Sequence, residues 1–258
     1  MGKGRTMKKA IGAVTAIVLI GLTASIARAN FTLTGSQQMT VNTQHTSGKL
    51  YDQSEVTILS GGAVTRIYAY DTSSVNMSGG QSGGIHTYNT STAHMSDGQV
   101  TMFFAHDTCN AYMSGGNAQH FRAYGAATAY LSNGEAGGFY AVETGTAYMS
   151  GGQANNIYAH ESGTMYVSGG QANSLYAYNL SKTTFIAQEF SLGTGLSVDG
   201  NRLRGTGSLS GRWLDGEPWT IYIRNNNADA TVLLTPEPAT LSLLALGGLM
   251  ILRRRRNH

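Results

Sequence analysis

The chain has 258 residues, with 17 Lys and Arg against 14 Asp and Glu, but the basic side chains gather at its two ends. Five lie within the first 28 residues and four close the chain, which leaves 17 − 9 = 8 basic against 14 acidic residues, a balance of −6 that excludes a nucleic-acid-binding face outside the termini. With 34 Gly and only 3 Pro, the composition is not that of a collagen, and the 41% of hydrophobic residues argues against disorder. The single cysteine, Cys109, excludes an internal disulfide framework and a multi-cysteine zinc site.

Residues 1–29 have the three parts of a secretory signal peptide. Lys8 and Lys9 precede an apolar run at 10–22, and Ala27-Arg28-Ala29 supplies a small-x-small cleavage site. Cleavage there makes Asn30 the first mature residue and signal peptidase a partner. A membrane anchor is the alternative, although the apolar run is short for a span of about 20 residues.

Residues 57–182 are built from an 18-residue repeat. Each unit carries Ser-Gly-Gly or a near variant, beginning at Ser60, Ser78, Ser96, Ser114, Ser132, Ser150 and Ser168. One such unit is too small to bury a core, so the units must stack on one another. Residues 30–56, which precede the repeat, are expected to cap the exposed end of the stack.

Side chains alternate in character along each unit. The residue just before the serine is apolar in every unit: Leu59, Met77, Met95, Met113, Leu131, Met149 and Val167. A second apolar column follows in the other half of the unit: Ile67, Ile85, Phe103, Phe121, Phe139, Ile157 and Leu175. Alternation with a period of two indicates half-buried strands. We therefore expect two short strands in each unit, joined by Gly-rich and polar turns.

These patterns predict an all-β fold, a single-stranded parallel β-helix or β-solenoid of about seven 18-residue rungs with a β-rich C-terminal cap. A right-handed winding is favoured. The recurring Ser-Gly-Gly units resemble the strand-loop-strand repeats of bacterial autotransporter passengers over about half of the chain. The resemblance implies the architecture, but the chain has no C-terminal outer-membrane barrel to imply the autotransporter export route.

Residues 183–234 abandon the 18-residue period and are expected to form the C-terminal cap. Trp213 and Trp219 stand on either side of Asp215-Gly216, which is a turn signal. This arrangement predicts a hairpin that packs its aromatic rings over the last rung. A pair of tryptophans that binds sugar is the alternative.

Residues 235–258 form a tail of three parts. Pro236, Glu237 and Pro238 come first, followed by an apolar segment at 239–252 and by Arg253, Arg254, Arg255 and Arg256. As a helix the apolar segment would be about 21 Å long, against a bilayer core of about 30 Å. The arginines would remain cytoplasmic, which agrees with export through the N-terminal signal.

This tail resembles the PEP-CTERM sorting domain of Gram-negative bacteria. The resemblance rests on Pro236-Glu237-Pro238, the Leu-rich segment with Gly247-Gly248, and the four closing arginines. It implies recognition near the Pro-Glu-Pro motif by an exosortase, a membrane cysteine peptidase-transferase. It also implies a bacterium that makes an extracellular polysaccharide matrix. An ordinary tail anchor with a chance Pro-Glu-Pro is the alternative.

The repeat offers little for catalysis or metal binding, and we expect no catalytic residue, metal or cofactor. A nine-residue calcium motif fails, because its acidic position would fall on Arg66, Gly84, Met102, His120, Gly138, Asn156 and Ser174. The histidines fall in several columns without ligand spacing, and Cys109 has neither a partner cysteine nor a motif around it.

One column of acidic residues leaves an enzyme hypothesis open. It contains Asp71, Asp107, Glu143 and Glu161. Neighbouring rungs would bring the last two within about 5 Å, which suits a retaining glycosidase. The favoured interpretation is a set of solvated turn residues, because Asn89, Gly125 and Asn179 share the column.

Tyrosines form the most suggestive surface. Tyr112, Tyr130, Tyr148 and Tyr166 lie in one column, and Tyr140, Tyr158 and Tyr176 lie in another. If exposed, these rings make a candidate ligand surface for an extracellular polysaccharide or a partner protein. The alternative is cross-rung stacking that stabilises the rod.

The sequence thus predicts an exported, exosortase-sorted, non-enzymatic protein with a structural or adhesive role. It would be anchored transiently in the inner membrane and then reside at the cell surface or in the extracellular matrix of a Gram-negative-type bacterium. No nucleic-acid partner is expected. The alternatives are a carbohydrate-binding module that uses the tyrosine columns and a polysaccharide-cleaving β-helix enzyme.

Overall fold

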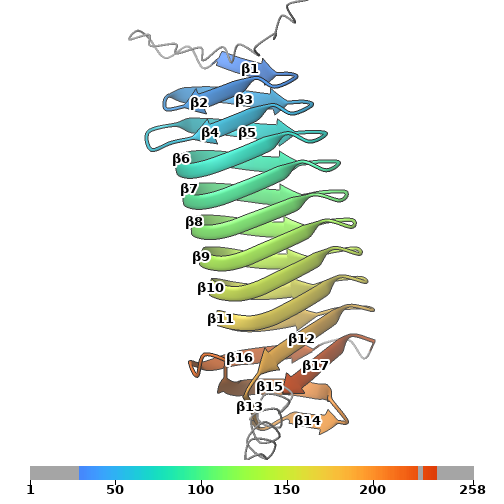
Figure 1. Ribbon diagram of the computed structural model, residues 1–258. Helices are drawn as coiled ribbons and strands as arrows, with labels where there is room; N and C mark the ends of the chain where they lie inside the picture. The colour runs from blue at the N-terminus through green and yellow to red at the C-terminus, as the bar shows by residue number, and fades with distance from the viewer. Residues whose placement is uncertain (1–28, 226–228, 237–258) are drawn as a thin grey trace, which may run out of the picture.

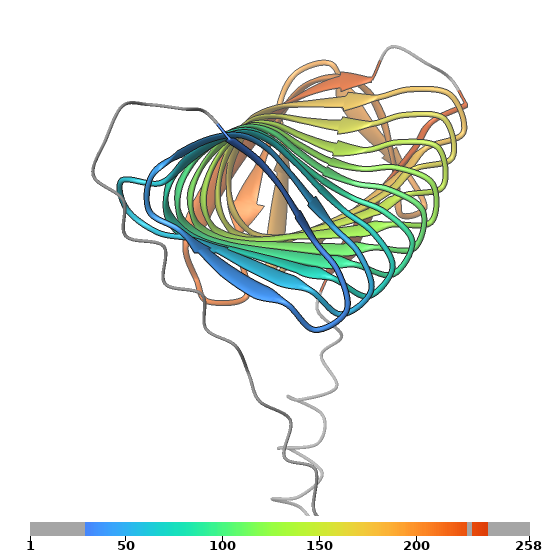
Figure 2. The same cartoon turned by 90° about the horizontal axis from the view of Figure 1, so that it is seen from above.

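The structure is a computed structural model that describes residues 29–225 and 229–236. They form an all-β solenoid of about nine turns, with rungs of about 18 residues and a β-rich C-terminal region (Figure 1). Seen along its axis, successive turns lie over one another and enclose a single elongated interior (Figure 2). The predicted fold class is confirmed, with about nine turns where the repeat predicts about seven.

The regular rungs are each one 14-residue strand: β6 (Ser74–Thr87), β7 (Thr92–Ala105), β8 (Asn110–Ala123), β9 (Thr128–Ala141), β10 (Thr146–Ala159) and β11 (Thr164–Ala177). Neighbours pair in parallel with an offset of 18, so that Tyr130 lies beside Tyr148 and Ile157 beside Leu175. Each backbone is therefore hydrogen-bonded to the rung before it and the rung after it.

A bend at Ser-Gly-Gly replaces the expected pair of short strands. Pairing shifts between Met149 and Gln153 and then resumes in register. Gly152 lies inside this interval with a φ of 72°, a conformation that glycine adopts without steric cost. The irregularity acts as a bulge that bends the strand without ending it. The true turns lie at the other end of the rung, between Ala159 and Thr164 for example.

The parallel ladder begins at residue 29, so residues 30–56 continue the stack where a separate cap was expected. Five short strands make up the first turns, residues 29–69: β1 (Ala29–Leu33), β2 (Gln38–Val41), β3 (Gln44–Leu50), β4 (Glu55–Ile58) and β5 (Ala63–Ala69). Gln38 pairs with Glu55 and Glu55 with Ser74, offsets of 55 − 38 = 17 and 74 − 55 = 19. Because these first rungs differ in length, the 18-residue period is not visible in this part of the sequence.

The same irregularity corrects one apolar position. Leu59 was expected inside, but Ile58 pairs with Met77 and takes that place in the column. Ile58 is fully buried, whereas Leu59 is 38% exposed. An additional residue between Ile58 and Ala63 moves Leu59 out of the stack, since four residues separate them against the three between Met77 and Gln81.

The two apolar columns form the core, as predicted. The column that begins with Ile58 and Met77 continues through every rung to Phe185, and none of its members is more than 2% exposed. In the other column Phe121 stacks between Phe103 and Phe139, with ring centroids 4.7 and 5.1 Å apart. Burial of these side chains supplies most of the driving force for folding.

The C-terminal region ends the parallel stack by reversing the chain. It contains β12 (Lys182–Ala187), β13 (Glu189–Leu192), β14 (Leu196–Asp199), β15 (Arg202–Arg212), β16 (Pro218–Asn225) and β17 (Thr231–Pro236). β12 and β16 together complete a turn on β11, and β17 pairs in parallel with β12. β15 then pairs antiparallel with β16 and β17. A strand of opposite direction thus covers the last rung.

The tryptophan pair packs over the end of the core. Trp213 and Trp219 are 3% and 4% exposed, and their ring centroids lie 4.4 Å apart. Trp219 also stacks on Phe185, and the Trp213 indole N–H donates to the Gly170 carbonyl at 2.8 Å. The rings are part of the cap, as the turn signal predicts, and they present no open face to a sugar.

The close approach of the bends generates a first prediction. A Cβ added to Gly152 would lie 2.8 Å from the Gly134 carbonyl oxygen, whereas one added to Gly200 meets nothing within 4 Å. Both glycines have a positive φ, of 72° and 62°. Gly200→Ala should therefore cost about 1 kcal/mol for the backbone conformation alone. Gly152→Ala should cost a further 1–3 kcal/mol, roughly, for the collision.

Urea denaturation of the two variants and the wild type measures this difference. Equal losses of unfolding free energy would show that the bends do not pack against one another as described.

Candidate functional site

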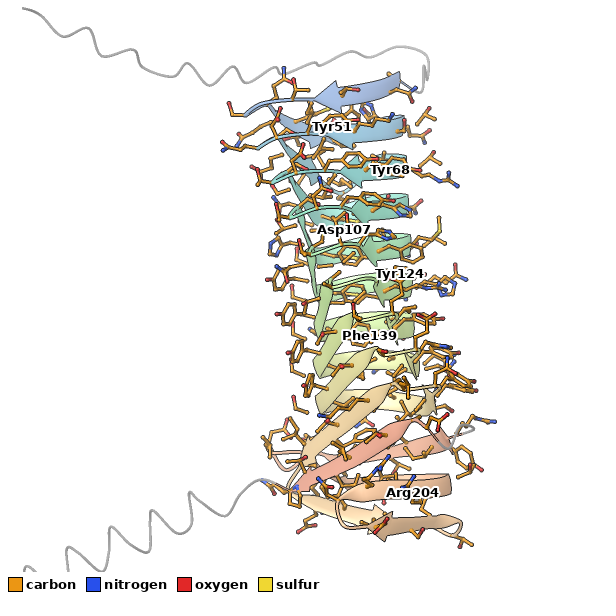
Figure 3. The ribbon with its side chains drawn as sticks, turned by 90° about the vertical axis from the view of Figure 1, so that its right-hand side faces the viewer. Tyr51, Tyr68, Asp107, Tyr124, Phe139 and Arg204 are labelled. Carbon is orange, nitrogen blue, oxygen red and sulfur yellow. The ribbon has the colours of Figure 1, made fainter. Side chains whose placement is uncertain are left out.

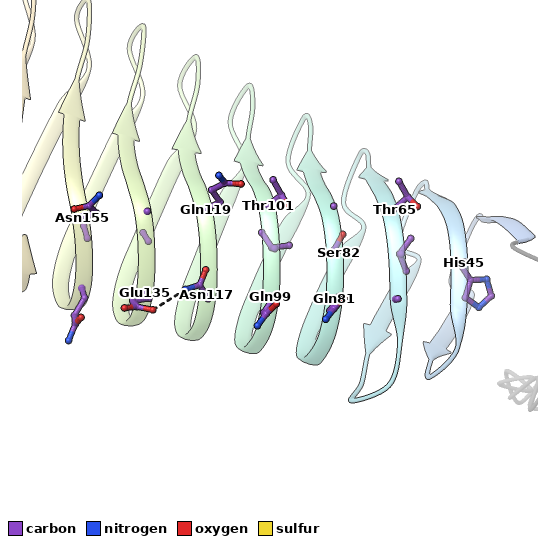
Figure 4. Close-up of a pocket in the computed structure, with 18 of the residues that line it drawn as sticks. His45, Thr65, Gln81, Ser82, Gln99, Thr101, Asn117, Gln119, Glu135 and Asn155 are labelled. Carbon is purple, nitrogen blue, oxygen red and sulfur yellow. Dashed lines mark hydrogen bonds between the residues drawn. The ribbon is translucent and has the colours of Figure 1, made fainter. Parts of the chain in front are cut away.

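One side of the solenoid carries a long groove of about 1030 Å³. Its lining residues come from eight strands that follow one another in space, β3 and then β5 to β11 (Figure 4). We call this feature the polar groove. It runs along the rod and crosses the rungs just after their bends.

The walls of the groove are two columns of residues, most of which have polar side chains. The first stands three residues after each serine and comprises Gln81, Gln99, Asn117, Glu135, Gln153 and Gln171, all exposed. The second stands two residues further on and comprises Thr65, Gly83, Thr101, Gln119, Gly137, Asn155 and Asn173. Because side chains alternate along a strand, the residue between the walls points inward.

The floor of the groove is this inward column, and its side chains are small. Val64, Ser82, Val100, Ala136 and Ala154 line it, and all are buried. These side chains point into the interior of the solenoid, so the strand backbone forms the base of the groove between the two walls.

Only some of the wall amides have protein partners. Asn117 donates to the Glu135 carboxylate at 2.9 Å, and Asn173 donates to the Asn155 side-chain oxygen at 2.8 Å. Within residues 29–225 and 229–236, the amides of Gln99, Gln119 and Gln153 have no hydrogen-bond partner. Such groups keep both their donor and acceptor capacity for a ligand.

The tyrosine surface predicted from the sequence is a stack of rings. Tyr112, Tyr130, Tyr148 and Tyr166 follow one another with centroids 4.8, 5.2 and 5.0 Å apart and planes within 9° of parallel. His94 extends the stack at 4.7 Å from Tyr112. Burial raises the pKa of Tyr148, and its neighbours Tyr166 and Tyr130 raise it further. The ring faces are covered by one another, so the stack presents mainly ring edges to the surroundings.

A second aromatic stack lies beside the turns. Tyr51, Tyr70, Tyr88, His106 and Tyr124 stack with centroid distances between 4.6 and 5.1 Å (Figure 3). His86, on the adjacent column, stacks on Tyr68 at 5.3 Å. Burial lowers the pKa of His86 to about 4, and the nearby His106 and Arg66 contribute. These histidines occupy aromatic positions, and the described residues contain no cluster of three or more potential metal ligands.

The acidic column has a structural use in the turns. Asp71, Asp107, Glu143 and Glu161 all have φ between 57° and 60°. The Asp107 carboxylate accepts a hydrogen bond from the Asn89 backbone N–H at 3.0 Å, and the Glu143 carboxylate accepts one from Gly125 at 3.1 Å. Each such carboxylate therefore fastens one turn to the turn of the preceding rung.

Cys109 takes the place of a buried serine in the turns. It aligns with Ser91, whose hydroxyl lies 3.5 Å from the Cys109 sulfur. The thiol is fully buried, and burial raises its pKa. A buried thiol with a raised pKa is a poor nucleophile.

The sorting residues lie mostly outside the described part of the chain. Ala27, Glu237, Pro238 and the four arginines at 253–256 fall there. Ala29 is the first residue of β1, and Pro236 is the last residue of β17, paired with Ala187. Both expected processing signals therefore adjoin the ends of the solenoid. No helix within residues 29–225 and 229–236 is long and apolar enough to cross a membrane.

The polar groove is the feature that the sequence analysis misses. A Gln, Asn or Glu stands three residues after each serine from Gln81 to Gln171, so the signal is present. Polar residues after Ser-Gly-Gly are typical of a turn, where they need no further explanation. The strand continues through this interval, however, and places them in an exposed row.

Comparison with known proteins finds no family, no curated protein and no solved structure that matches this chain. The fold itself assigns the architecture, which is a β-solenoid of about 18 residues per rung. Its function is inferred from the chemistry of its own surfaces.

The ring stack generates a second prediction. Tyr148→Ala removes two stacked ring pairs, one with Tyr130 and one with Tyr166. Each such pair contributes about 0.5–1.5 kcal/mol to stability. Tyr222→Ala is the control, because Tyr222 is about equally exposed, at 39% against 38%, and among the described residues its ring is contacted by the Arg224 guanidinium but stacks on no other ring. The unfolding free energy should fall by roughly 1–3 kcal/mol more for Tyr148→Ala. Similar losses in the two variants would contradict a stabilising stack.

His86 generates a third prediction, on acid stability. Its pKa is lowered from 6.5 to about 4 on folding, so the unfolded chain binds more protons between these values. Stability should therefore fall as the pH drops from about 6.5 towards 4. His86→Phe keeps an aromatic ring against Tyr68 but cannot titrate, so its stability should fall less over the same range. Denaturation curves at several pH values measure both slopes, and identical slopes would contradict the prediction.

Proposed function

We propose that this protein is an exported, non-enzymatic structural or adhesive rod of the bacterial envelope and its extracellular polysaccharide matrix. The observation that carries the proposal is the position of the two sorting signals. Ala29 begins β1 and Pro236 ends β17, so cleavage after Ala29 would remove only the first residue of β1, and cleavage beyond Pro236 would leave β17 whole.

The construction of the rod supports a structural role. Most side chains that could carry chemistry are engaged in contacts between rungs. Tyrosines stack on tyrosines, turn carboxylates accept backbone hydrogen bonds, and threonines such as Thr90 donate to the preceding turn. Such repetition gives stiffness and a long surface, which are the properties that a scaffold or adhesin needs.

The sorting part of the proposal rests on the resemblance of residues 236–258 to PEP-CTERM domains. The partners would be signal peptidase and an exosortase-type membrane peptidase. The chain would cross the inner membrane, remain anchored there briefly, and reach the cell surface or the matrix after processing. The repeats, similar to those of autotransporter passengers, agree with exposure at the cell surface.

A fractionation experiment tests this function and makes a fourth prediction. The full chain and a variant lacking residues 236–258 are expressed in a bacterium that encodes an exosortase. The full chain should be shortened at both ends and recovered from the surface or matrix fraction. The shortened variant should be released into the medium or the periplasm. Intact-mass analysis of the recovered protein locates both cleavage points.

An unchanged location and an unchanged mass on deletion of residues 236–258 would overturn the sorting proposal. The control variant replaces the arginines at 253–256 by glutamines and leaves the Pro-Glu-Pro motif intact. It should still be exported but should lose its retention at the membrane, since the positive residues hold the tail on the cytoplasmic side.

Carbohydrate binding is the second candidate function. The tyrosine stack fits it less well than expected, because the ring faces that would stack on sugars contact one another. The observation that favours it is the polar groove with its unpaired amides. A polysaccharide-cleaving enzyme is less favoured, because Glu143, one of the two carboxylates that it would require, accepts a hydrogen bond from the Gly125 backbone N–H in a turn.

A further inference from the structure

The length of the polar groove points to a linear polymer. Its lining spans eight strands, and seven intervals of about 4.8 Å give a length of about 34 Å. Small-molecule sites are usually enclosed and bury most of their ligand. This groove is open along its length and presents a Gln, Asn or Glu of its first wall at each rung from β6 to β11, so a ligand with its own linear repeat matches it best.

The wall chemistry points to a ligand rich in hydroxyl groups. A hydroxyl both donates and accepts, and so does a primary amide. Gln99 and Gln153 on one wall and Gln119 on the other have no partner in the described part of the protein. Thr101 adds a hydroxyl to the second wall. These groups stand in two rows on either side of the inward column (Figure 4), so a chain laid between the rows can be hydrogen-bonded along both of its edges.

The charge of the groove points to a neutral ligand. Its lining includes one carboxylate, Glu135, and no lysine or arginine. A polyanionic chain, whether nucleic acid or uronate, would find no lysine or arginine among the lining residues to neutralise it, and only a single histidine, His45. Glu135 is moreover already hydrogen-bonded to Asn117.

The backbone argues against a peptide ligand. Peptides commonly bind to sheets by adding a strand to an unpaired edge. Every strand from β5 to β11 is paired on both sides, so the groove offers only side chains.

We propose that the polar groove binds one extended chain of a neutral polysaccharide, laid parallel to the axis of the rod. This inference rests on the proposed function, because an exported matrix protein meets such chains, and it names the ligand class for that role. The wall amides donate to and accept from the sugar hydroxyls, and the sugar chain lies over the strand backbone of the inward column from Val100 to Ala154.

The experiment compares neutral and acidic polysaccharides as probes. Purified protein comprising the mature chain is run in native gels that contain dextran, hydroxyethylcellulose, soluble starch, alginate or polygalacturonate. At least one neutral probe should retard the protein, and the acidic probes should not. The triple variant Gln99→Ala, Gln119→Ala and Gln153→Ala should weaken that binding by about tenfold or more, through the loss of several hydrogen bonds.

The matched control replaces exposed polar residues outside the groove. Gln53→Ala, Asn133→Ala and Ser162→Ala together should leave binding unchanged. A second test blocks the groove without removing its amides. Thr101→Cys modified with a bulky maleimide should lose binding, and Ser162→Cys modified in the same way should retain it. The native Cys109 is fully buried and should not react.

The inference is overturned if no neutral probe binds, if only acidic probes bind, or if the groove variants bind as well as the wild type. These outcomes are independent of the fractionation result. A protein that reaches the matrix but binds no neutral glycan refutes the groove inference alone. A protein that binds through the groove but is not processed at its C-terminal signal refutes the sorting proposal alone.

Discussion

Parallel pairing between successive rungs is the interaction on which the rest of this protein depends. Each strand is hydrogen-bonded to the strands one turn before and one turn after it, so in the regular rungs, apart from the bends, each paired residue lies beside the residue 18 positions away. At a spacing of about 4.8 Å, each column must be filled by residues that pack well against copies of themselves. Tyrosine on tyrosine, phenylalanine on phenylalanine and alanine on alanine meet that condition.

The same condition accounts for the scarcity of charge. Like charges directly opposite one another on neighbouring strands are destabilising, so a column of lysines or aspartates would oppose stacking. Only 12% of the residues are charged. The column that does collect acids interleaves them with Asn89, Gly125 and Asn179 and places them in exposed turns, where carboxylates such as those of Asp107 and Glu143 accept backbone hydrogen bonds. The low content of charged residues, which first suggests that a catalytic site is lacking, is therefore also required for the rungs to stack.

Strict periodicity decides how much of the structure can be read from the sequence. The interior columns and the solenoid itself follow from the spacing of 18, because pairing preserves it from β6 to β11. The first turns escape detection because their offsets are 17 and 19, and the added residue near Leu59 shifts the apolar column by one position. The bend is not predicted from the sequence, because Ser-Gly-Gly has the composition of a turn. In the structure Gly152 bends the strand without ending it. That reading also concealed the polar groove, whose wall residues follow the bend directly.

The aromatic and amide columns differ in how many ring faces or hydrogen-bonding groups remain free for a ligand after the rungs have stacked. A ring between two parallel rings has both faces covered, as Tyr148 has between Tyr130 and Tyr166, so its interactions are largely completed within the rod. A primary amide has two donors and one acceptor oxygen, and a neighbour in the same column can satisfy only part of this capacity. Gln99 and Gln153 are exposed on the wall of the polar groove and have no partner among the described residues. For this reason the rows that look most like binding surfaces in the sequence are stabilising stacks, and the plainer glutamine row is the one left with hydrogen bonds to offer a ligand.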